Sequence, residues 1–344
     1  MRALTISAHG GTEQLEFRTD IPVPEPTPGS VRVRVQAAAL NHLDVFTLRG
    51  LPGVTITPPW IMGADAVGTI DAVGHGVYST PGDRVVINPG ISDRTCEYCR
   101  MGEHSLCTHF GLLGEHHPGT FAEYVVVPAG NVRTIPESIP TERAAAFTLA
   151  TLTAWRMVVT RAAVKAGDEV LIWGIGGGVA QAALQIAKQR GARVWVTSGS
   201  DEKLERARQL GADETLNHRT MKIGREIRAR TGKRGVTVVI DCVGQDTWKE
   251  SLTALGRAGR LVTCGGTSGP VVETDVRRLF WNQWTIMGST MGNDTEFDAV
   301  VEELRAGRLT PVVDSVYDLE NGRAAFDRMA GGEQFGKIVL CVAS

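Results

Sequence analysis

The sequence lacks an apolar run of the length that a membrane-spanning helix requires, about 18 residues or more. It also lacks a secretory signal at its start, where residues 1–6 are typical of a first β-strand. Neither sign of charge dominates, because 36 Lys and Arg against 38 Asp and Glu leave a net charge of −2. We therefore expect a cytoplasmic protein that acts on a small-molecule substrate, with neither nucleic acid nor a membrane as a partner.

Cysteine is scarce as well, with 6 residues among 344. Three of them crowd into the stretch from Cys96 to Cys107, whereas the others are scattered through strand-like segments, at Cys242, Cys264 and Cys341. The simplest interpretation of the scattered cysteines is that they are small, apolar, buried side chains. This usage suits a reducing compartment better than a secreted protein stabilised by disulfides.

The sequence does contain a glycine-rich turn between two apolar strands. A strand-like run over 170–173 is followed by four glycines between Gly174 and Gly178, an amphipathic helix and a second strand over 194–197. The turn is one residue longer than a strict G-x-G-x-x-G and has the form Gly174-x-x-Gly177-x-x-Ala180. The start of such a helix offers unpaired N–H groups to a pyrophosphate, here those of Gly177, Gly178 and Val179. We predict a dinucleotide site; the alternative is a tight structural turn without a ligand.

The order of the expected elements divides the chain into two domains. Residues 1–150 are mainly β structure, with strands over 31–36, 66–70, 84–87 and 121–127 and an alanine-rich helix over 142–155. From residue 151 to residue 289 strands and helices alternate, which predicts an α/β domain with a parallel, doubly wound sheet. A helix beginning near Asn293 and a last strand over 336–340 complete the chain.

Several motifs resemble those of the medium-chain dehydrogenase/reductase superfamily over the whole chain. They are AAALNHLD at 37–44, GADAVG at 63–68, the cysteine stretch, the glycine turn and GKIVL at 336–340. The resemblance implies a GroES-like, β-rich catalytic domain made of residues 1–150 and 290–344, and a Rossmann cofactor domain made of residues 151–289. It also implies an active-site cleft between the domains and assembly into a homodimer or homotetramer.

The resemblance further implies a nicotinamide cofactor, and the residues favour NADPH. Members that bind NAD carry an acidic residue at the end of the second Rossmann strand, where this chain has Ser198. Ser200 offers a hydrogen-bond donor to a 2′-phosphate and Lys203 a positive charge, although a solvated helix residue is the alternative for Lys203. In relatives, the residue at the position of His218 contacts the phosphate and the residue at the position of Thr153 lies near the nicotinamide. The residue at the position of Lys337 contacts the pyrophosphate there.

The cysteine stretch has the spacing of the structural zinc lobe in zinc-type members of the superfamily. Four cysteines are usual there, whereas this chain has Asp93-x-x-Cys96-x-x-Cys99-x7-Cys107. Zinc accepts carboxylate oxygen as well as thiolate, so Asp93 is a competent replacement. We predict one structural zinc ion bound by these four residues; the alternatives are free thiols left from a lost site and redox-active cysteines.

The catalytic zinc of alcohol dehydrogenases in the superfamily has no matching ligand set in this sequence. Those enzymes place a cysteine at the position of Asn41, His-Glu at Ala64-Asp65 and a second cysteine near Leu149. Alanine and leucine carry no ligand atom, and an amide is a poor ligand for zinc. A relocated metal site remains an alternative, built from His42, Asp44, Asp65, Glu115, His116 and His117.

An asparagine at position 41 without metal ligands resembles the zeta-crystallin-like quinone oxidoreductases. That resemblance implies NADPH-dependent transfer of hydride to a quinone or an α,β-unsaturated carbonyl compound, with Asn41, His42 and Asp44 as the catalytic residues. Two alternatives stay open: a zinc-dependent alcohol or carbonyl dehydrogenase with a non-standard site, and a cofactor-binding protein without turnover. Neither the substrate nor the proton donor follows from the sequence.

Overall fold

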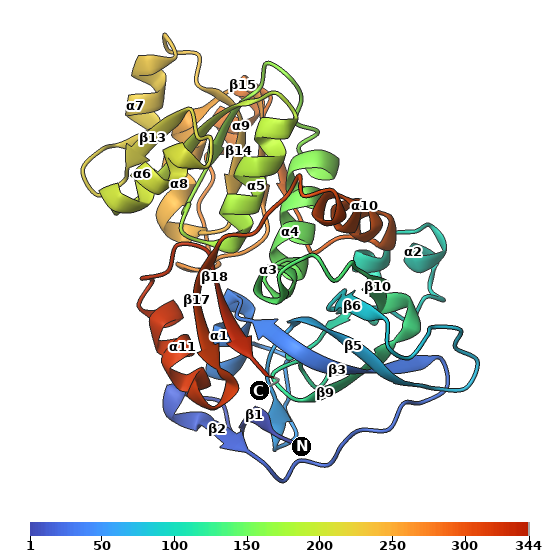
Figure 1. Ribbon diagram of the computed structural model, residues 1–344. Coiled ribbons are helices and arrows are strands. Elements are labelled where there is room, and N and C mark those ends of the chain that lie inside the picture. Colours follow the sequence, from blue (N-terminus) through green and yellow to red (C-terminus); the bar gives the residue numbers. More distant parts are fainter. Residues whose placement is uncertain (343–344) are drawn as a thin grey trace. The chain divides into compact units, whose positions relative to one another are not determined.

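The chain from Met1 to Ala150 and the chain from Gly292 onward fold together, and Thr151–Met291 forms a second unit. The computed structural model describes residues 1–342 (Figure 1). The fold is an α/β fold that joins a GroES-like β-rich domain to a Rossmann domain. The second unit ends at Met291, two residues beyond the predicted limit at Ser289.

The first unit is built around a seven-stranded sheet of order β10-β6-β5-β3-β18-β17, with β9 also pairing with β3. Its strands are β3 (Ser30–Ala39), β5 (Asp65–Val73), β6 (Arg84–Ile87), β9 (Tyr124–Pro128), β10 (Val132–Thr134), β17 (Val313–Asp318) and β18 (Lys337–Cys341). In Figure 1 β3 and β18 lie side by side, although they come from opposite ends of the chain. The C-terminal segment is therefore part of the first unit's core, which includes Val33, Ile70, Phe121, Phe326 and Leu340.

Smaller elements surround this sheet. Two further sheets contain β1 (Ala3–Ile6), β2 (Leu15–Arg18) and β4 (Trp60–Ile61), and β7 (Gly90–Ile91) with β8 (Gly111–Leu112). The helices are α1 (His42–Arg49), α2 (Glu97–Arg100), α3 (Thr141–Ala145), α10 (Asp294–Arg305) and α11 (Gly322–Ala330). A single helix was expected over 142–155, but it is broken into α3 and α4 (Thr148–Trp155), and the break places Thr148 at the start of a helix.

The second unit contains a parallel six-stranded sheet of order β13-β12-β11-β14-β15-β16, as the alternating pattern predicts. Its strands are β11 (Glu169–Ile172), β12 (Arg193–Ser198), β13 (Glu214–Asn217), β14 (Val236–Asp241), β15 (Leu255–Thr263) and β16 (Thr285–Gly288). The helices are α5 (Gly178–Gln189), α6 (Asp201–Gln209), α7 (Ile223–Arg230), α8 (Gln245–Ala254) and α9 (Val276–Asn282), and a π-helical turn over Arg156–Arg161 extends α4. The core of this unit includes Trp173, Trp195, Trp248 and Trp284.

Sequence periodicity missed α1, α7, β13, β17 and α11. α7 is strongly charged and is amphipathic only through positions such as Ile223 and Ile227, and β17 is largely half-exposed.

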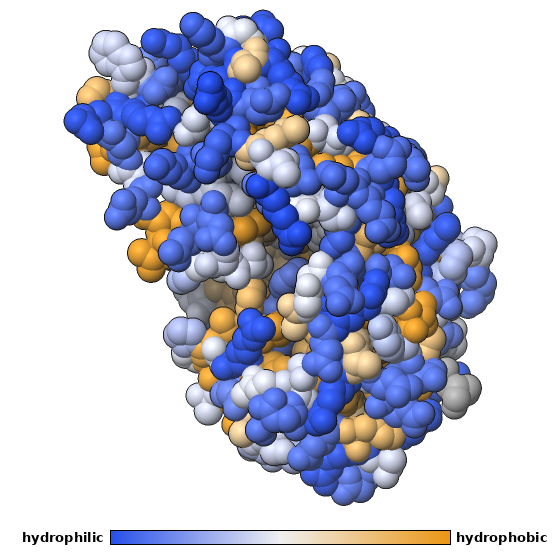
Figure 2. Space-filling model, turned by 90° about the vertical axis from the view of Figure 1, so that its left-hand side faces the viewer, coloured by the Kyte–Doolittle hydropathy of each residue, from blue (hydrophilic) through white to orange (hydrophobic). Residues whose placement is uncertain are grey.

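No helix within residues 1–342 has the length and apolar character needed to cross a membrane. Hydrophilic side chains cover most of the face in Figure 2, with apolar ones in smaller patches between them.

Candidate active site, metal cluster and cofactor loop

Asn41 stands where β3 ends and α1 begins. Its backbone is extended, with φ −129° and ψ 159°, and it occupies the N-cap position of α1. The Asp44 carboxylate accepts a hydrogen bond of 2.6 Å from the Asn41 backbone N–H, as in a capping box. Asp44 thus holds the turn that orients Asn41, and its side chain is almost fully buried, with 1% exposed.

Asp65, the first residue of β5, is fully buried and accepts four hydrogen bonds. One carboxylate oxygen accepts from the Thr148 hydroxyl at 2.6 Å and from the Leu149 backbone N–H at 2.7 Å. The other accepts from the Asn41 side-chain amide at 3.0 Å and from the Lys337 ammonium at 2.9 Å. Both oxygens are therefore saturated by protein donors, as a buried carboxylate requires.

Lys337 supplies the positive charge of this buried network. It is the first residue of β18, is 4% exposed, and donates to the Asn41 side-chain oxygen as well as to Asp65. We name the group of Asn41, Asp65, Thr148 and Lys337 the buried network. The pyrophosphate contact expected of Lys337 stays a prediction, because the contacts seen for its ammonium are all within this network.

The buried network does not fit a catalytic metal ion. The side chains beside it at Ala64 and Leu149 carry no ligand atom, and the oxygens of Asn41 and Asp65 already accept from donors within the first unit. Residues of the alternative metal site do not come together either. Within residues 1–342, only the Asp93 cluster brings three or more His, Cys, Asp or Glu ligand atoms together.

Asp44 and His42, the two titratable residues of α1 among the catalytic candidates, have pKa values that their surroundings shift. Burial raises the pKa of Asp44 to about 7, against the opposing effect of the Asn41 N–H and the Lys337 ammonium. The side chain of His42 is exposed, but desolvation by the surrounding protein lowers its pKa, and Lys337 lowers it further. At neutral pH His42 is consequently a neutral imidazole with one N–H donor.

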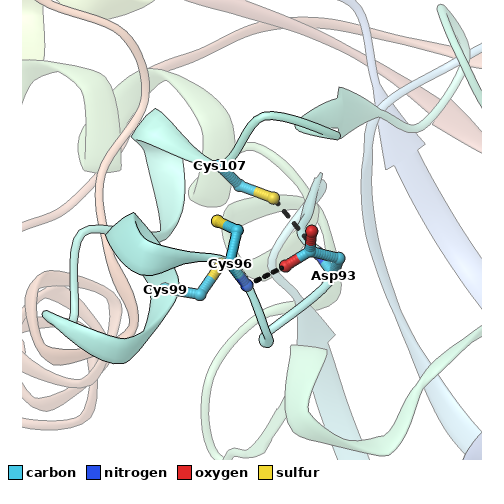
Figure 3. A group of neighbouring side chains, drawn as sticks. All are labelled: Asp93, Cys96, Cys99 and Cys107. Atoms are coloured by element: carbon cyan, nitrogen blue, oxygen red, sulfur yellow. Dashed lines mark hydrogen bonds between the residues drawn. The ribbon is translucent and has the colours of Figure 1, made fainter.

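Asp93, Cys96, Cys99 and Cys107 form a second cluster, in which one potential ligand atom of each residue lies within 4.8 Å of all the others (Figure 3). The separation is close to that in tetrahedral zinc sites, where a Zn–S bond of about 2.3 Å places sulfurs about 3.8 Å apart. Cys96 precedes α2 and Cys99 lies within it, while Asp93 and Cys107 come from the flanking loops. The donor set, three sulfurs and one carboxylate, fits zinc.

Hydrogen bonds hold the cluster in place. The Asp93 carboxylate accepts from the backbone N–H groups of Thr95 at 2.8 Å and Cys96 at 2.9 Å, and these bonds lower its pKa far below the usual range. Cys107 Sγ accepts from the N–H groups of Asp93 and His109, both at 3.3 Å. The cysteine pKa values diverge, since the Cys99 N–H lowers that of Cys96 while burial raises that of Cys99.

His109 is a residue of this cluster that sequence reasoning missed. Its Nδ1 lies 2.8 Å from the second Asp93 oxygen, and the ring is otherwise exposed. A histidine hydrogen-bonded to a ligating carboxylate fixes the orientation of that ligand. The sequence feature that could have identified His109 is its position two residues after Cys107. The four-cysteine spacing has no residue at that position.

The glycine turn joins β11 to α5 as predicted. Gly174 has φ +68°, and its N–H donates to the Thr197 hydroxyl at 3.2 Å, so the loop is fixed to β12. α5 begins at Gly178 with Gly177 as its N-cap, and no side chain caps it. Gln181, in the first turns of α5, has a buried side-chain nitrogen with no partner among the described residues. An uncapped helix start after a glycine turn fits a pyrophosphate; Val179 is half-buried there.

The residues expected near the 2′-phosphate lie at the end of β12. Ser198 accepts from the Ser200 N–H at 3.1 Å, and the Ser200 hydroxyl caps α6 by accepting from the Lys203 N–H at 3.3 Å. His218 and Arg219 flank Gly199 closely: a Cβ there would lie 3.0 Å from His218 Nε2 and 2.7 Å from Arg219 Nε. Arg219 was not among the predicted site residues, although the adjacent His218 was.

Thr153 and His218, two further candidates for contacts with the cofactor, also lie in the second unit. Thr153, in α4, is buried and donates to the Met291 sulfur at 3.5 Å. The His218 ring lies 6.3 Å from that of Trp173, which immediately precedes the glycine turn, and burial lowers the pKa of His218. His218 is therefore neutral at physiological pH.

A Rossmann sheet with an uncapped glycine turn, joined to a GroES-like domain, defines a dinucleotide-dependent oxidoreductase of two domains. Comparison with known proteins agrees. A family model described as "Alcohol dehydrogenase GroES-like domain" matches residues 27–137, and one described as "Zinc-binding dehydrogenase" matches residues 178–306. The chain belongs to the medium-chain dehydrogenase/reductase superfamily and is an oxidoreductase.

Relatives span several activities. The chain is 30% identical to a quinone oxidoreductase of Homo sapiens, over 99% of this chain and 97% of the relative. It is 29% identical to an acryloyl-coenzyme A reductase of Sulfurisphaera tokodaii, over 99% of each chain. A solved structure described as an NAD-dependent alcohol dehydrogenase superposes with a TM-score of 0.95 at 44% identity and covers 100% of both chains. The family therefore includes enzymes that are named for different substrates.

Proposed function

We propose that the protein is an NADPH-dependent oxidoreductase that transfers hydride to a quinone or an α,β-unsaturated carbonyl compound without a catalytic metal ion. The observation that carries this proposal is the buried network. A lysine ammonium and saturated hydrogen bonds fill the positions that provide metal ligands in zinc-dependent members. Positive charge is thus present beside Asn41, but it is a fixed ammonium that Asp65 neutralises.

The chemistry of the acceptor follows from this arrangement. An isolated ketone needs strong polarisation of its oxygen before hydride arrives, and zinc commonly supplies it. In a conjugated acceptor the incoming charge moves to an enolate or phenolate oxygen, which hydrogen bonds stabilise. The human relative is named for a quinone and the archaeal reductase for an acryloyl thioester, and both names describe conjugated acceptors.

The residues of α1 have separate roles in this proposal. The Asn41 amide is already engaged with Asp65 and Lys337, so Asn41 positions the start of α1. His42 is exposed and neutral, with an N–H group that donates to the oxygen of the substrate and relays a proton to it. Asp44 supports both residues through the cap of α1. NADPH supplies the hydride when it is bound.

The preference for NADPH rests on the end of β12. Ser198 replaces the acidic residue that would repel a 2′-phosphate, and Arg219 and His218 provide donors beside Gly199. The half-buried Lys203, in the first turn of α6, adds a positive charge. Arg219→Ala is expected to weaken NADPH binding about tenfold and to leave NADH binding nearly unchanged. Titration of both cofactors by fluorescence checks this, and Arg225→Ala, on the surface of α7, is the matched control. Equal loss of both cofactors would contradict the assignment.

We also propose a homodimer or homotetramer in the cytoplasm. α9 and the loop before it expose large apolar side chains, Val271, Val276, Phe280 and Trp281. α9 directly precedes β16 in the chain, and β16 is the edge strand of the six-stranded sheet. An apolar patch beside an unpaired strand edge suits a second copy of the chain.

The decisive experiment is a screen of NADPH consumption over quinones, enones, aldehydes and alcohols, with metal content measured on the same sample. Quinones or enones should turn over, and chelators that spare the fold should leave turnover intact. Asn41→Ala and His42→Ala should lower turnover more than NADPH affinity. A second candidate, a zinc-dependent alcohol dehydrogenase, is favoured by the description of the 44% identical structure. Alcohol oxidation that is lost on chelation and restored by zinc would establish that candidate instead.

A further inference from the structure

Two of the scattered cysteines, Cys242 and Cys264, meet in the second unit. They directly follow β14 and β15, whose last residues, Asp241 and Thr263, are register partners. Their Sγ atoms lie 3.3 Å apart. The sequence interpretation of Cys242, Cys264 and Cys341 as buried apolar residues is wrong in this respect, since all three thiols are only partly buried.

The backbone geometry at this pair suits a disulfide. Neighbouring strands lie about 4.8 Å apart, within the range of about 4.4–6.8 Å between Cα atoms that disulfides span. Contacts between the two loops hold the thiols together: the Ser268 N–H donates to the Val243 carbonyl at 2.9 Å, and the Thr267 hydroxyl donates to the Cys242 carbonyl at 3.4 Å. The sulfurs need to approach by little more than 1 Å to reach a bond length of about 2.05 Å.

The surroundings of Cys242 make its thiol a weak acid. Their mutual hydrogen bond, burial and the nearby negative charges of Cys264 and Asp241 raise the pKa of Cys242 well above its usual range. Cys242 therefore keeps its proton at neutral pH. Because only a thiolate attacks a peroxide readily, Cys242 is suited to the second, resolving step and not to the first attack.

We propose that Cys242 and Cys264 form a dithiol that a hydroperoxide oxidises to an intramolecular disulfide. In the first step the Cys264 thiolate attacks the peroxide, the O–O bond breaks, and Cys264 becomes a sulfenic acid while the peroxide is reduced to an alcohol or water. In the second step Cys242 sulfur attacks the Cys264 sulfur, the S–O bond breaks, and the Cys242 proton leaves with the oxygen as water. A reduced dithiol reagent reverses the oxidation.

The position of the pair connects its oxidation to the cofactor. The carboxyl ends of parallel strands are where dinucleotides bind in Rossmann sheets. Val243, next to Cys242, lies against the glycine turn, because a Cβ on Gly174 would be 3.7 Å from its side chain. Drawing Cys242 toward Cys264 shifts Val243 and the turn with it. We therefore expect the disulfide to weaken cofactor binding several-fold, an effect that rests on the proposed cofactor site.

Peptide mapping of the full chain under non-reducing conditions tests the dithiol. The purified enzyme is treated with stepwise amounts of hydrogen peroxide, alkylated and digested. A cross-linked peptide joining Cys242 to Cys264 should appear and should vanish after dithiothreitol. Cys341→Ser, which removes a thiol outside the pair, should form the same cross-link. Recovery of both residues as alkylated thiols, or their oxidation to sulfinic acids without a cross-link, would overturn the proposal.

Cofactor titration tests the consequence separately. Oxidised wild type and oxidised Cys341→Ser should bind NADPH several-fold more weakly than their reduced forms, and dithiothreitol should restore the affinity. Cys242→Ser, with a thermal melt confirming its fold, should show no such loss. A mapped disulfide with unchanged affinity would refute the coupling to the cofactor. A reduced protein that fails to bind NADPH would refute the proposed function and leave the mapped disulfide standing.

Discussion

The first unit contains two positions at which members of this family bind zinc, and the two are built in opposite ways. At the Asp93 cluster, three sulfurs and a carboxylate face one another, and N–H groups orient the carboxylate and one sulfur. At the buried network, an ammonium lies beside the carboxylate and both carboxylate oxygens accept from protein donors. The Asp93 cluster is preorganised to bind a metal cation, whereas the cation of the buried network is the Lys337 ammonium.

The comparison shows that a carboxylate alone does not indicate a metal site. Asp93 is 22% exposed in its side chain and Asp65 is fully buried, yet Asp93 has the sulfur partners that zinc prefers and Asp65 does not. Asp65 keeps its negative charge in the interior because Lys337 neutralises it and four donors solvate it. The two sites differ in the residues that surround each carboxylate. Each of those residues can be replaced by mutation to test its contribution.

Removal of the chain's own cation is expected to have the largest effect. Lys337→Met leaves Asp65 charged and unpaired in the interior, which should lower the free energy of unfolding by about 3–5 kcal/mol. Urea denaturation measures this. Arg18→Ala, which removes an exposed ion pair with Asp20 of 2.7 Å, is the control and should leave the free energy of unfolding nearly unchanged, because solvent screens exposed ion pairs.

A second substitution separates the loss of charge balance from the loss of packing. Adding Asp65→Asn to Lys337→Met removes the unpaired carboxylate, so part of the lost stability should return. If Lys337→Met costs no more than Arg18→Ala, the buried network does not carry the balanced charge that distinguishes it from the Asp93 cluster.

The Asp93 cluster should hold one zinc ion per chain. Asp93→Ala removes one of four ligands and is expected to weaken zinc binding about a hundredfold. Elemental analysis and competition with a chromophoric chelator measure the stoichiometry and the affinity. Asp65→Asn, in the buried network, is the matched control and should leave one zinc bound. Protein without zinc would contradict the prediction that the Asp93 cluster binds zinc. Two zinc ions per chain would contradict the prediction that the buried network binds none.

A pH dependence of stability is also expected from Asp44, whose carboxylate accepts from the backbone N–H of Asn41 beside the buried network. Its pKa of about 7 in the folded protein exceeds the ordinary value of 3.8, so the folded state retains a proton that the unfolded chain releases. The contribution of Asp44 to stability is therefore complete below about pH 4 and is lost as the pH rises through about 7. Asp44→Asn imitates the protonated form at every pH.

The measurement is the free energy of unfolding of wild type minus that of Asp44→Asn, at intervals between pH 4 and pH 8. It should fall with rising pH by about 4 kcal/mol, since the pKa rises from 3.8 to about 7 on folding and one pKa unit corresponds to about 1.4 kcal/mol. A flat profile for Asp44→Asn would show that burial does not control this carboxyl group.

The smallest effect is expected at His109. His109→Ala removes the imidazole that orients the Asp93 carboxylate, and zinc affinity should fall about tenfold, as for other partners of metal ligands. Chelator competition measures the change. His75→Ala, which alters an exposed histidine elsewhere in the first unit, should leave the affinity unchanged. An unchanged affinity for His109→Ala would mean that the backbone N–H groups alone orient Asp93.

Much of this protein follows from local sequence patterns. The glycine turn, the helix after it and the alternation of strands predicted the parallel sheet, because each feature depends on residues within a few positions of one another. The spacing of Asp93 and three cysteines likewise predicted a cluster, since ligands on short adjacent turns have few ways to arrange themselves. Charged or half-exposed elements such as α7 and β17 lacked a periodicity strong enough to be recognised.

Tertiary structure alone decided the partners of buried charges and thiols. Lys337 meets Asn41 across 296 positions of sequence, because β18 returns to pair with β3. Arg219 joins Gly199, and Cys242 joins Cys264, through the register of strands that are neighbours only in the sheet. No local pattern encodes such a pairing: burial of two distant segments determines which side chains face each other, and only then does the low-dielectric interior require that their charges and hydrogen bonds match.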